Sequence, residues 1–352
     1  MTGNGAGGGV LRVGVGLIAA VIGAVTPLSA QEAITPEVCA VTAAELAAPD
    51  PVSAQGTRTQ VNGLGRFWRL TAASGQVSYL WGSIHSSDPA ILALPPEVEA
   101  ALGQSRVLVL ESDPRAKSRT EIAERALQAG VWLAPSDQPW DKPWLTGPAR
   151  VWAEERVAGL MQDDAAFAAL TDMGLASLLL TDPCEDFVAG VLPVQDHRIL
   201  LAAYEAGIPV AGLSAADAFV NDLSQPEQAE TARAIAQIYA AYLNPEGFSL
   251  ARAASVGLYR AGRIGDMIAG DQSYLTGYFG SKQARALRTM ADAYLIAERN
   301  KRFLRAMKSY LDQGGALVAV GAFHLPGKDG LIEALRVDGY RVERVPTAGE
   351  DG

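Results

Sequence analysis

Two strand-length stretches in the body of the chain are apolar at every position, and they constrain the fold more than any other feature. They are residues 107–110, Val-Leu-Val-Leu, and residues 316–320, Ala-Leu-Val-Ala-Val. Successive side chains of a strand point to opposite faces of its sheet, so a strand that is apolar throughout is buried on both faces. The sequence therefore predicts a sheet that is covered on both sides.

Shorter patterns complete this sheet and separate its strands along the chain. Strand-like segments occur at residues 67–70, 77–81, 207–213 and 340–345, and the first two are joined by the turn Ala73-Ser74-Gly75-Gln76. Residues 115–290 are rich in Ala and Leu and mostly helical by period, and a long amphipathic helix is predicted from about Lys282 to Leu311. We predict an α/β fold in which a single mixed sheet is assembled from the N- and C-terminal halves. A helical insertion, about 115–290, lies between them.

The N-terminus has the features of a secretory signal peptide. Arg12 is the one charged residue of the first thirty, an apolar run follows at 13–25, and Leu28-Ser29-Ala30 is a small-residue cleavage site. Cleavage after about Ala30 would make the protein periplasmic or secreted. The alternative is an uncleaved inner-membrane anchor, so any membrane proximity is expected only through this segment. Residues 31–64 are predicted to be a flexible lead-in to an α/β domain at 65–352.

The net charge indicates which partners are disfavoured, and the cysteines bear on the compartment in which the protein works. The formal net charge is −10 and no cluster of Lys and Arg is present, which disfavours nucleic acid as a partner. The two cysteines, Cys39 and Cys184, would meet oxidising conditions after export. Whether they form a disulfide is left open by the sequence.

Two of the three histidines occur in matching contexts at the ends of predicted strands. They belong to the motifs Gly82-x-x-His85 and Gly321-x-x-His324, and Glu111 likewise follows the apolar strand 107–110. Ligands of open α/β sheets bind beyond the carboxyl ends of the strands, where these three side chains should meet. Two imidazoles and a carboxylate suit a divalent metal ion such as zinc, manganese or cobalt, with positions left for water.

Each of these residues also has a simpler interpretation. A Gly-x-x-His motif can cap a strand, and Glu111 could be a metal ligand, a general base, or a helix-capping or salt-bridged carboxylate. His197 lies at a predicted helix start, where a capping or surface role is expected rather than metal binding. The charged run 298–302 is by pattern a solvated helix face, although Arg299 and Asn300 near a metal would orient a substrate carbonyl.

Several segments of the chain resemble the TraB/GumN family, which includes the TIKI metalloproteases. In the family's order along residues 64–345, the matching segments are Phe67-Trp68-Arg69-Leu70, Tyr79-Leu80-Trp81-Gly82-Ser83-Ile84-His85, Val107-Leu108-Val109-Leu110-Glu111-Ser112-Asp113, Lys142-Pro143-Trp144, Asp196 through Gly207-Ile208-Pro209-Val210-Ala211-Gly212-Leu213, Glu298-Arg299-Asn300 and Gly321-Ala322-Phe323-His324-Leu325-Pro326-Gly327. No single motif is specific, but the ordered set is.

The resemblance implies a fold related to the erythromycin-esterase and ChaN-like proteins, and it implies metal dependence. Position by position it points to His85, His324 and Glu111 as the metal site, with Arg299 and Asn300 as supporting residues. The sequence departs from the family in two places. Ser83 stands where the family commonly has threonine, and Ser214 stands where it often has glutamate. Any catalytic or metal-binding role of that glutamate would be lost here.

The leading functional expectation is an exported metal-dependent hydrolase that acts on peptide or amide bonds. In this hypothesis the ion activates water, Glu111 binds the ion or accepts the proton, and Arg299 polarises the substrate carbonyl. The alternative is a non-catalytic periplasmic binding or scaffold protein, related to haem, a metal or a polysaccharide. Three tryptophans would suit ligand stacking or, equally, core packing: Trp132, Trp140 and Trp144.

Overall fold

A computed structural model describes seven stretches of the chain. They are residues 60–86, 88–114, 131–134, 139–161, 163–181, 194–246 and 248–350. The predicted signal peptide, nearly all of the lead-in, and both Cys39 and Cys184 lie outside the described residues. The cleavage site therefore stays a prediction, and the pairing of the two cysteines stays open.

One six-stranded sheet forms the centre of the protein, with the strand order β4-β3-β5-β2-β1-β6. Its strands are β1 (Phe67–Thr71), β2 (Val77–Ser83), β3 (Val107–Ser112), β4 (Val210–Ser214), β5 (Ala316–Gly321) and β6 (Arg341–Arg344). Strands β4, β3, β5 and β2 are parallel, whereas β1 pairs antiparallel with both β2 and β6. The single mixed sheet is confirmed, and the predominantly helical middle of the chain contributes its edge strand β4.

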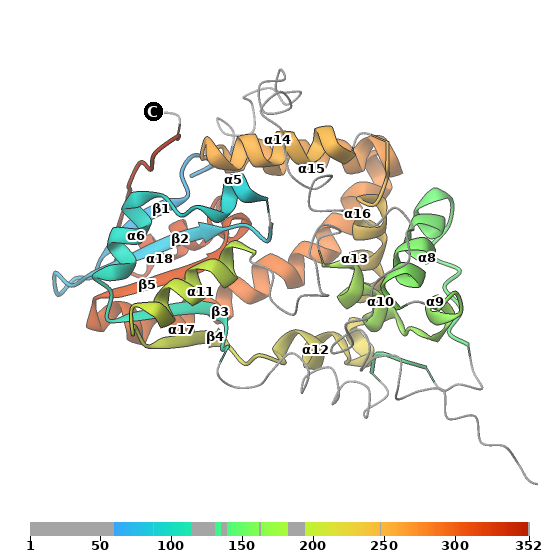
Figure 1. Ribbon diagram of the computed structural model, residues 1–352, viewed down its shortest axis with the longest axis horizontal. Helices are drawn as coiled ribbons and strands as arrows, with labels where there is room; N and C mark the ends of the chain where they lie inside the picture. The colour runs from blue at the N-terminus through green and yellow to red at the C-terminus, as the bar shows by residue number, and fades with distance from the viewer. Residues whose placement is uncertain are drawn as a thin grey trace, which may run out of the picture.

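The helices of the described residues lie on both sides of the sheet and in a separate helical region (Figure 1). They are α5 (Pro89–Leu92), α6 (Pro96–Gly103), α8 (Pro148–Met161), α9 (Ala166–Ala169), α10 (Asp172–Leu179), α11 (Gln195–Glu205), α12 (Ala218–Leu223), η1 (Pro226–Gln228), α13 (Ala229–Ala241), α14 (Phe248–Arg260), α15 (Ile264–Phe279), α16 (Ser281–Asp292), η2 (Ala293–Glu298), α17 (Arg299–Gln313), η3 (Ala322–His324) and α18 (Leu331–Val337). Figure 1 shows α14 and α15 running from the sheet toward the helical region along the top of the molecule. None of the described helices is long and apolar enough to cross a membrane.

Side chains of β5 alternate between two hydrophobic cores, one on each face of the sheet. Leu317 and Ala319 point into the core that contains Ile199 of α11, whereas Val318 and Val320 join the core that is covered by α17 and α18. These four side chains are fully buried. This is the arrangement expected for a strand without polar positions, and it confirms the predicted coverage of both faces.

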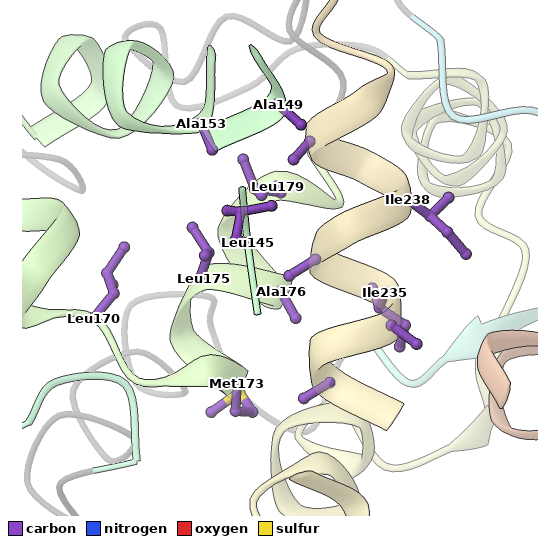
Figure 2. Close-up of a cluster of buried hydrophobic side chains, with 14 of the residues drawn as sticks. Leu145, Ala149, Ala153, Leu170, Met173, Leu175, Ala176, Leu179, Ile235 and Ile238 are labelled. Carbon is purple, nitrogen blue, oxygen red and sulfur yellow. The ribbon is translucent and has the colours of Figure 1, made fainter. Parts of the chain in front are cut away.

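A third hydrophobic core holds the helical region together. Figure 2 shows Leu175 and Ala176 of α10 packed near Ile235 of α13, with Leu145 beside them. Trp132 and Trp144 pack against this core, which is the packing role that the sequence left open for them. The predicted long helix is present, but its middle segment η2 has π-helical hydrogen bonding.

Candidate functional site at the carboxyl edge of the sheet

The four parallel strands bring their carboxyl ends to one edge of the sheet. Ser83 at the end of β2 pairs with Gly321 at the end of β5, and Ser112 of β3 pairs with Ser214 of β4. Glu111 lies inside β3 rather than just after it, because the strand extends two residues beyond the apolar stretch. The edge therefore gathers the residues that sequence analysis selected, and their side-chain contacts determine what the edge can bind.

Glu111 is mostly buried and has contacts of three kinds. Its Oε1 accepts a hydrogen bond of 2.6 Å from the backbone N–H of Gly321, and its Oε2 forms an ion pair with Arg299. The same Oε1 lies 3.5 Å from Nε2 of His324. A Cβ at Gly321 would lie 3.2 Å from Oε1, so the glycine allows the carboxylate to approach this closely.

His324 is held by Asn300 in a defined orientation. Its Nδ1 lies 2.6 Å from Oδ1 of Asn300, whose Nδ2 donates to the backbone carbonyls of His324 at 3.3 Å and Asp329 at 3.1 Å. Since the amide nitrogen faces carbonyl oxygens, the amide oxygen is the acceptor for His324, and the hydrogen-bond network assigns the imidazole proton to Nδ1. The lone pair of Nε2 then faces the carboxylate of Glu111.

The surroundings set the charge states of this pair. Burial raises the pKa of Glu111, but Arg299, the two histidines and the Gly321 N–H outweigh it and lower that pKa to about 2. Burial lowers the pKa of His324 to about 4, against the opposing effect of Glu111. At neutral pH the site therefore holds a carboxylate anion beside a neutral imidazole, which are the protonation states that a metal ion requires of its ligands.

Arg299 and Asn300 are adjacent in sequence, and both contact the site. They begin α17 directly after the π-helical segment η2, and π-helical turns are frequent at functional sites. The charge pattern favoured a solvated face here, which is wrong for these two residues, since Asn300 is buried and Arg299 is paired with Glu111. Glu298 and Lys301 on either side are exposed, as the pattern predicts.

His85 lies at the rim of the same edge rather than inside the cluster. Its side chain is 61% exposed, and its Nδ1 is 3.9 Å from Oδ2 of Asp196. Within the part of the chain that the structure describes, no three His, Cys, Asp or Glu side chains are grouped closely enough to hold a metal ion. As placed, Glu111 and His324 supply two donors, and His85, whose charge acts on both of them, is a candidate for a third.

Asp196, Gln195 and Tyr259 also hold the loop that carries His85, and none of them was predicted to be a site residue. The hydroxyl of Ser83 donates to Oδ1 of Asp196 at 2.7 Å, and the N–H of Ile84 donates to Gln195 at 3.3 Å. The Tyr259 hydroxyl lies 2.5 Å from the same Gln195 oxygen and 2.7 Å from the carbonyl of Gly82. The one available signal was that Asp196 begins a segment resembling the family. His197 follows it in the first turn of α11, where a helix start was predicted.

The side chain of Ser214 contacts the backbone of Glu111 and not its carboxylate. Its hydroxyl donates to the carbonyl oxygen of Glu111 at 2.6 Å, from the end of the neighbouring strand β4. A glutamate at this position would add a second carboxylate beside Glu111, and the serine instead ties the two strand ends together.

The fold and the edge define a class: an α/β protein in which a buried imidazole and a mostly buried carboxylate lie beside a partly exposed guanidinium at the carboxyl ends of parallel strands. Residues 66–344 match the TraB/PrgY/gumN family, and since this is well over half of the chain, the protein belongs to that family. Comparison with curated proteins and with solved structures gave no match.

Proposed function

We propose that the protein is an exported metal-dependent hydrolase acting on peptide or amide bonds. One observation carries the proposal: Nε2 of His324 faces Oε1 of Glu111 at 3.5 Å while Nδ1 is held by Asn300. Two lone-pair donors that face each other without a proton between them repel, and a cation bound by both removes that repulsion. Imidazole and carboxylate are also common ligands of catalytic zinc and related ions.

The residues present fit such an ion in their chemistry. His324 and Glu111 would hold it, and His85 at the rim would supply the third ligand. A bound ion would lower the pKa of a coordinated water to ~7 and so make it a nucleophile at neutral pH. With its pKa at about 2, Glu111 is a poor proton acceptor near neutrality, so a ligand role suits it better than that of general base.

Arg299 would act on the substrate. Its side chain is 22% exposed while it pairs with Glu111, so part of it is open to solvent and to a substrate. A carbonyl oxygen that develops negative charge during hydrolysis would be stabilised by this cation in a partly buried site. Asn300 would keep Nε2 of His324 turned toward the ion, which is the usual task of the partner at the second imidazole nitrogen.

Metal content and affinity test the proposal. We expect about one equivalent of zinc, manganese or cobalt in the wild type, and loss of it in a folded His85→Ala/His324→Ala double variant. The matched control is His197→Ala, which removes the third histidine and should keep the metal. A wild type that binds none of these ions more tightly than the double variant contradicts the metal site.

Turnover tests the hydrolase separately. Wild-type protein is expected to cleave members of a peptide library, and Glu111→Gln is expected to abolish cleavage while circular dichroism shows an intact fold. Export is tested by the N-terminus of the protein recovered from expressing cells, which should begin near Gln31 if the predicted signal peptide is removed.

A second candidate is a binding or scaffold protein without catalysis. The ion pair with Arg299 occupies one oxygen of Glu111, and no three-ligand group occurs among the described residues, both of which favour it. The serine at position 214 points the same way. Metal or ligand binding without turnover of any library member would support this candidate over the hydrolase.

A further inference from the structure

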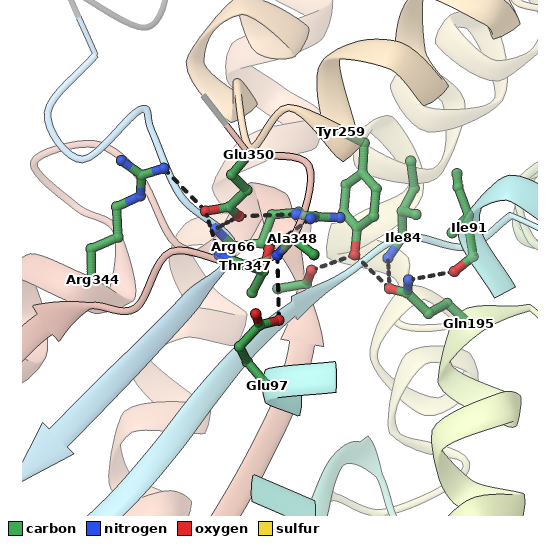
Figure 3. A network of polar contacts seen from close by, with 11 residues as sticks. Arg66, Ile84, Ile91, Glu97, Gln195, Tyr259, Arg344, Thr347, Ala348 and Glu350 are labelled. Atoms are coloured by element: carbon green, nitrogen blue, oxygen red, sulfur yellow. Dashed lines mark hydrogen bonds and ion pairs between the residues drawn. The ribbon is translucent and has the colours of Figure 1, made fainter. Parts of the chain in front are cut away.

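The N-terminus of α11 holds the loop that carries His85 at two points. Gln195 accepts a hydrogen bond from the N–H of Ile84 at 3.3 Å and donates from Nε2 to the carbonyl of Ile91 at 2.9 Å (Figure 3). These two contacts lie on either side of His85 in the sequence. The next residue of the helix, Asp196, directs its carboxylate at the histidine itself.

The two oxygens of Asp196 are not equivalent. Oδ1 accepts the 2.7 Å hydrogen bond from the hydroxyl of Ser83. Oδ2 is buried, lies 3.9 Å from Nδ1 of His85, and accepts no hydrogen bond from any described residue. A buried carboxylate oxygen without a donor is costly, so a donor that reaches it gains more than an average hydrogen bond. Nδ1 of His85 is the ring nitrogen that the structure places next to it.

The second motif, Gly321-x-x-His324, shows the same arrangement with the hydrogen bond at Nδ1 formed. There Nδ1 of His324 lies 2.6 Å from Oδ1 of Asn300, and Nε2 is left facing the carboxylate of Glu111. Asn300 belongs to α17, which covers one face of the sheet, whereas Asp196 belongs to α11, which covers the other. Each Gly-x-x-His histidine therefore has a side-chain oxygen at Nδ1, supplied by a helix on its own face of the sheet.

We propose that Asp196 is the positioning residue of His85: its Oδ2 accepts the Nδ1–H of the imidazole and turns Nε2 toward Glu111 and His324. The proposal rests on the proposed function in so far as Nε2 is turned toward a metal ion. The hydrogen bond itself needs no metal. A modest closure of the exposed imidazole brings 3.9 Å to the roughly 3 Å of a charge-assisted hydrogen bond.

A purely structural role of Asp196 must be separated from this one. Asp196 lies in the first turn of α11, where a negative charge is favourable, and it also bonds Ser83. Asp196→Asn keeps the shape and an oxygen for Ser83, but its amide nitrogen cannot accept from His85. Ser83→Ala is the matched control, because it removes the contact at Oδ1 and leaves the carboxylate oxygen Oδ2 in place.

The experiment measures the ring ¹⁵N chemical shifts of the three histidines in chelator-treated full-length protein at alkaline pH, with His85→Gln assigning the His85 signals. In the wild type and in Ser83→Ala, His85 is expected in the Nδ1–H tautomer. In Asp196→Asn the population should move toward the Nε2–H tautomer, while the His324 signals stay unchanged. A His85 tautomer that is the same in wild type and Asp196→Asn overturns the proposal.

Metal titration then separates this proposal from the proposed function. If the wild type binds metal, Asp196→Asn should weaken the affinity about 10–100-fold, the usual effect of losing a partner behind a ligating histidine. Equal affinities of the variant and the wild type would overturn the positioning role. If the wild type binds no metal, the proposed function fails, and the tautomer measurement still decides between the two roles of Asp196.

Discussion

Glu350 and Glu111 are two of the buried carboxylates that pair with arginine, and they differ in what else they contact. Both oxygens of Glu350 accept from N–H donors: Oε1 from the backbone and side chain of Arg66 at 3.1 Å each, and Oε2 from Arg344 at 3.1 Å and the Thr347 N–H at 3.4 Å (Figure 3). The Arg66 guanidinium lies 5.3 Å from the centre of the Trp81 ring and 4.8 Å from that of Tyr259.

The carboxylate of Glu111 is not surrounded by donors on all sides. Gly321 and Arg299 donate to it, but its third neighbour is the unprotonated Nε2 of His324, which is an acceptor like the carboxylate itself. A carboxylate surrounded by donors anchors the chain, and here it ties the segment at 347–350 to Arg66, just before β1, and to Arg344 of β6. A carboxylate that faces another lone pair lacks a donor on that side, and both lone pairs would attract a cation placed between them. Burial and an ion pair are common to both, so the remaining neighbour distinguishes the structural site from the candidate functional one.

The largest effect is expected from Glu350→Gln. The amide would direct N–H groups at existing donors and leave the buried Arg66 without its counter-ion, which typically costs about 3–5 kcal/mol of unfolding free energy. Urea denaturation measures this loss, and metal affinity should stay as in the wild type. A loss below ~1 kcal/mol would place this pair with surface ion pairs and contradict its role as a structural anchor.

Acid should weaken the folded protein through the Glu111–His324 pair. Because the pKa of His324 is lowered from 6.5 to about 4, the unfolded chain binds a proton in that window that the folded protein does not. Stability therefore falls as the pH falls from 6.5 toward 4, by about 3 kcal/mol in total. Glu111, lowered from 4.5 to about 2, extends the loss to lower pH, because its contribution is fully present only above pH 4.5.

Denaturation of chelator-treated protein at a series of pH values measures this slope. His324→Gln should flatten it between pH 6.5 and 4, whereas the control His197→Gln should keep it. A slope that His324→Gln leaves unchanged would mean that His324 is not the buried neutral imidazole that the comparison requires.

The orientation of His324 is expected to depend on Asn300. Asn300→Ala removes the oxygen at Nδ1 and should weaken metal affinity about 10–100-fold, equivalent to about 1.4–2.7 kcal/mol. Isothermal titration measures the change, and Lys301→Ala is the matched control, since its exposed side chain is next in sequence. Equal affinities in the two variants would contradict an orienting role for Asn300.

Sequence patterns predicted the sheet and most of the edge because both depend on local, periodic signals. The apolar stretches 107–110 and 316–320 require burial on two faces, and a glycine followed by histidine at a strand end is visible in the sequence alone. Glu111 could be placed at the same edge for the same reason. These predictions needed the direction of each strand but no knowledge of distant side chains.

Side-chain contacts between residues far apart in the sequence could not be predicted from such local patterns. A charged run on a helix is by pattern solvated, and only the tertiary fold turns Arg299 toward Glu111, 188 residues away in the sequence. The Arg66–Glu350 pair is separated by 284 residues, and neither residue stands out among the charges of the chain. The same holds for Asp196, whose significance comes from the buried oxygen that it turns to His85.

The smallest effect is expected at Ser214, which contacts the backbone of Glu111. The Ser214 hydroxyl donates to the backbone carbonyl of Glu111 and not to its carboxylate, so Ser214→Ala removes one neutral hydrogen bond. Such a loss costs about 0.5–1.5 kcal/mol of unfolding free energy and leaves the two facing lone pairs in place. Metal affinity should therefore equal that of the wild type in titration. If Ser214→Ala instead weakens metal binding as much as Asn300→Ala does, the hydroxyl belongs to the site.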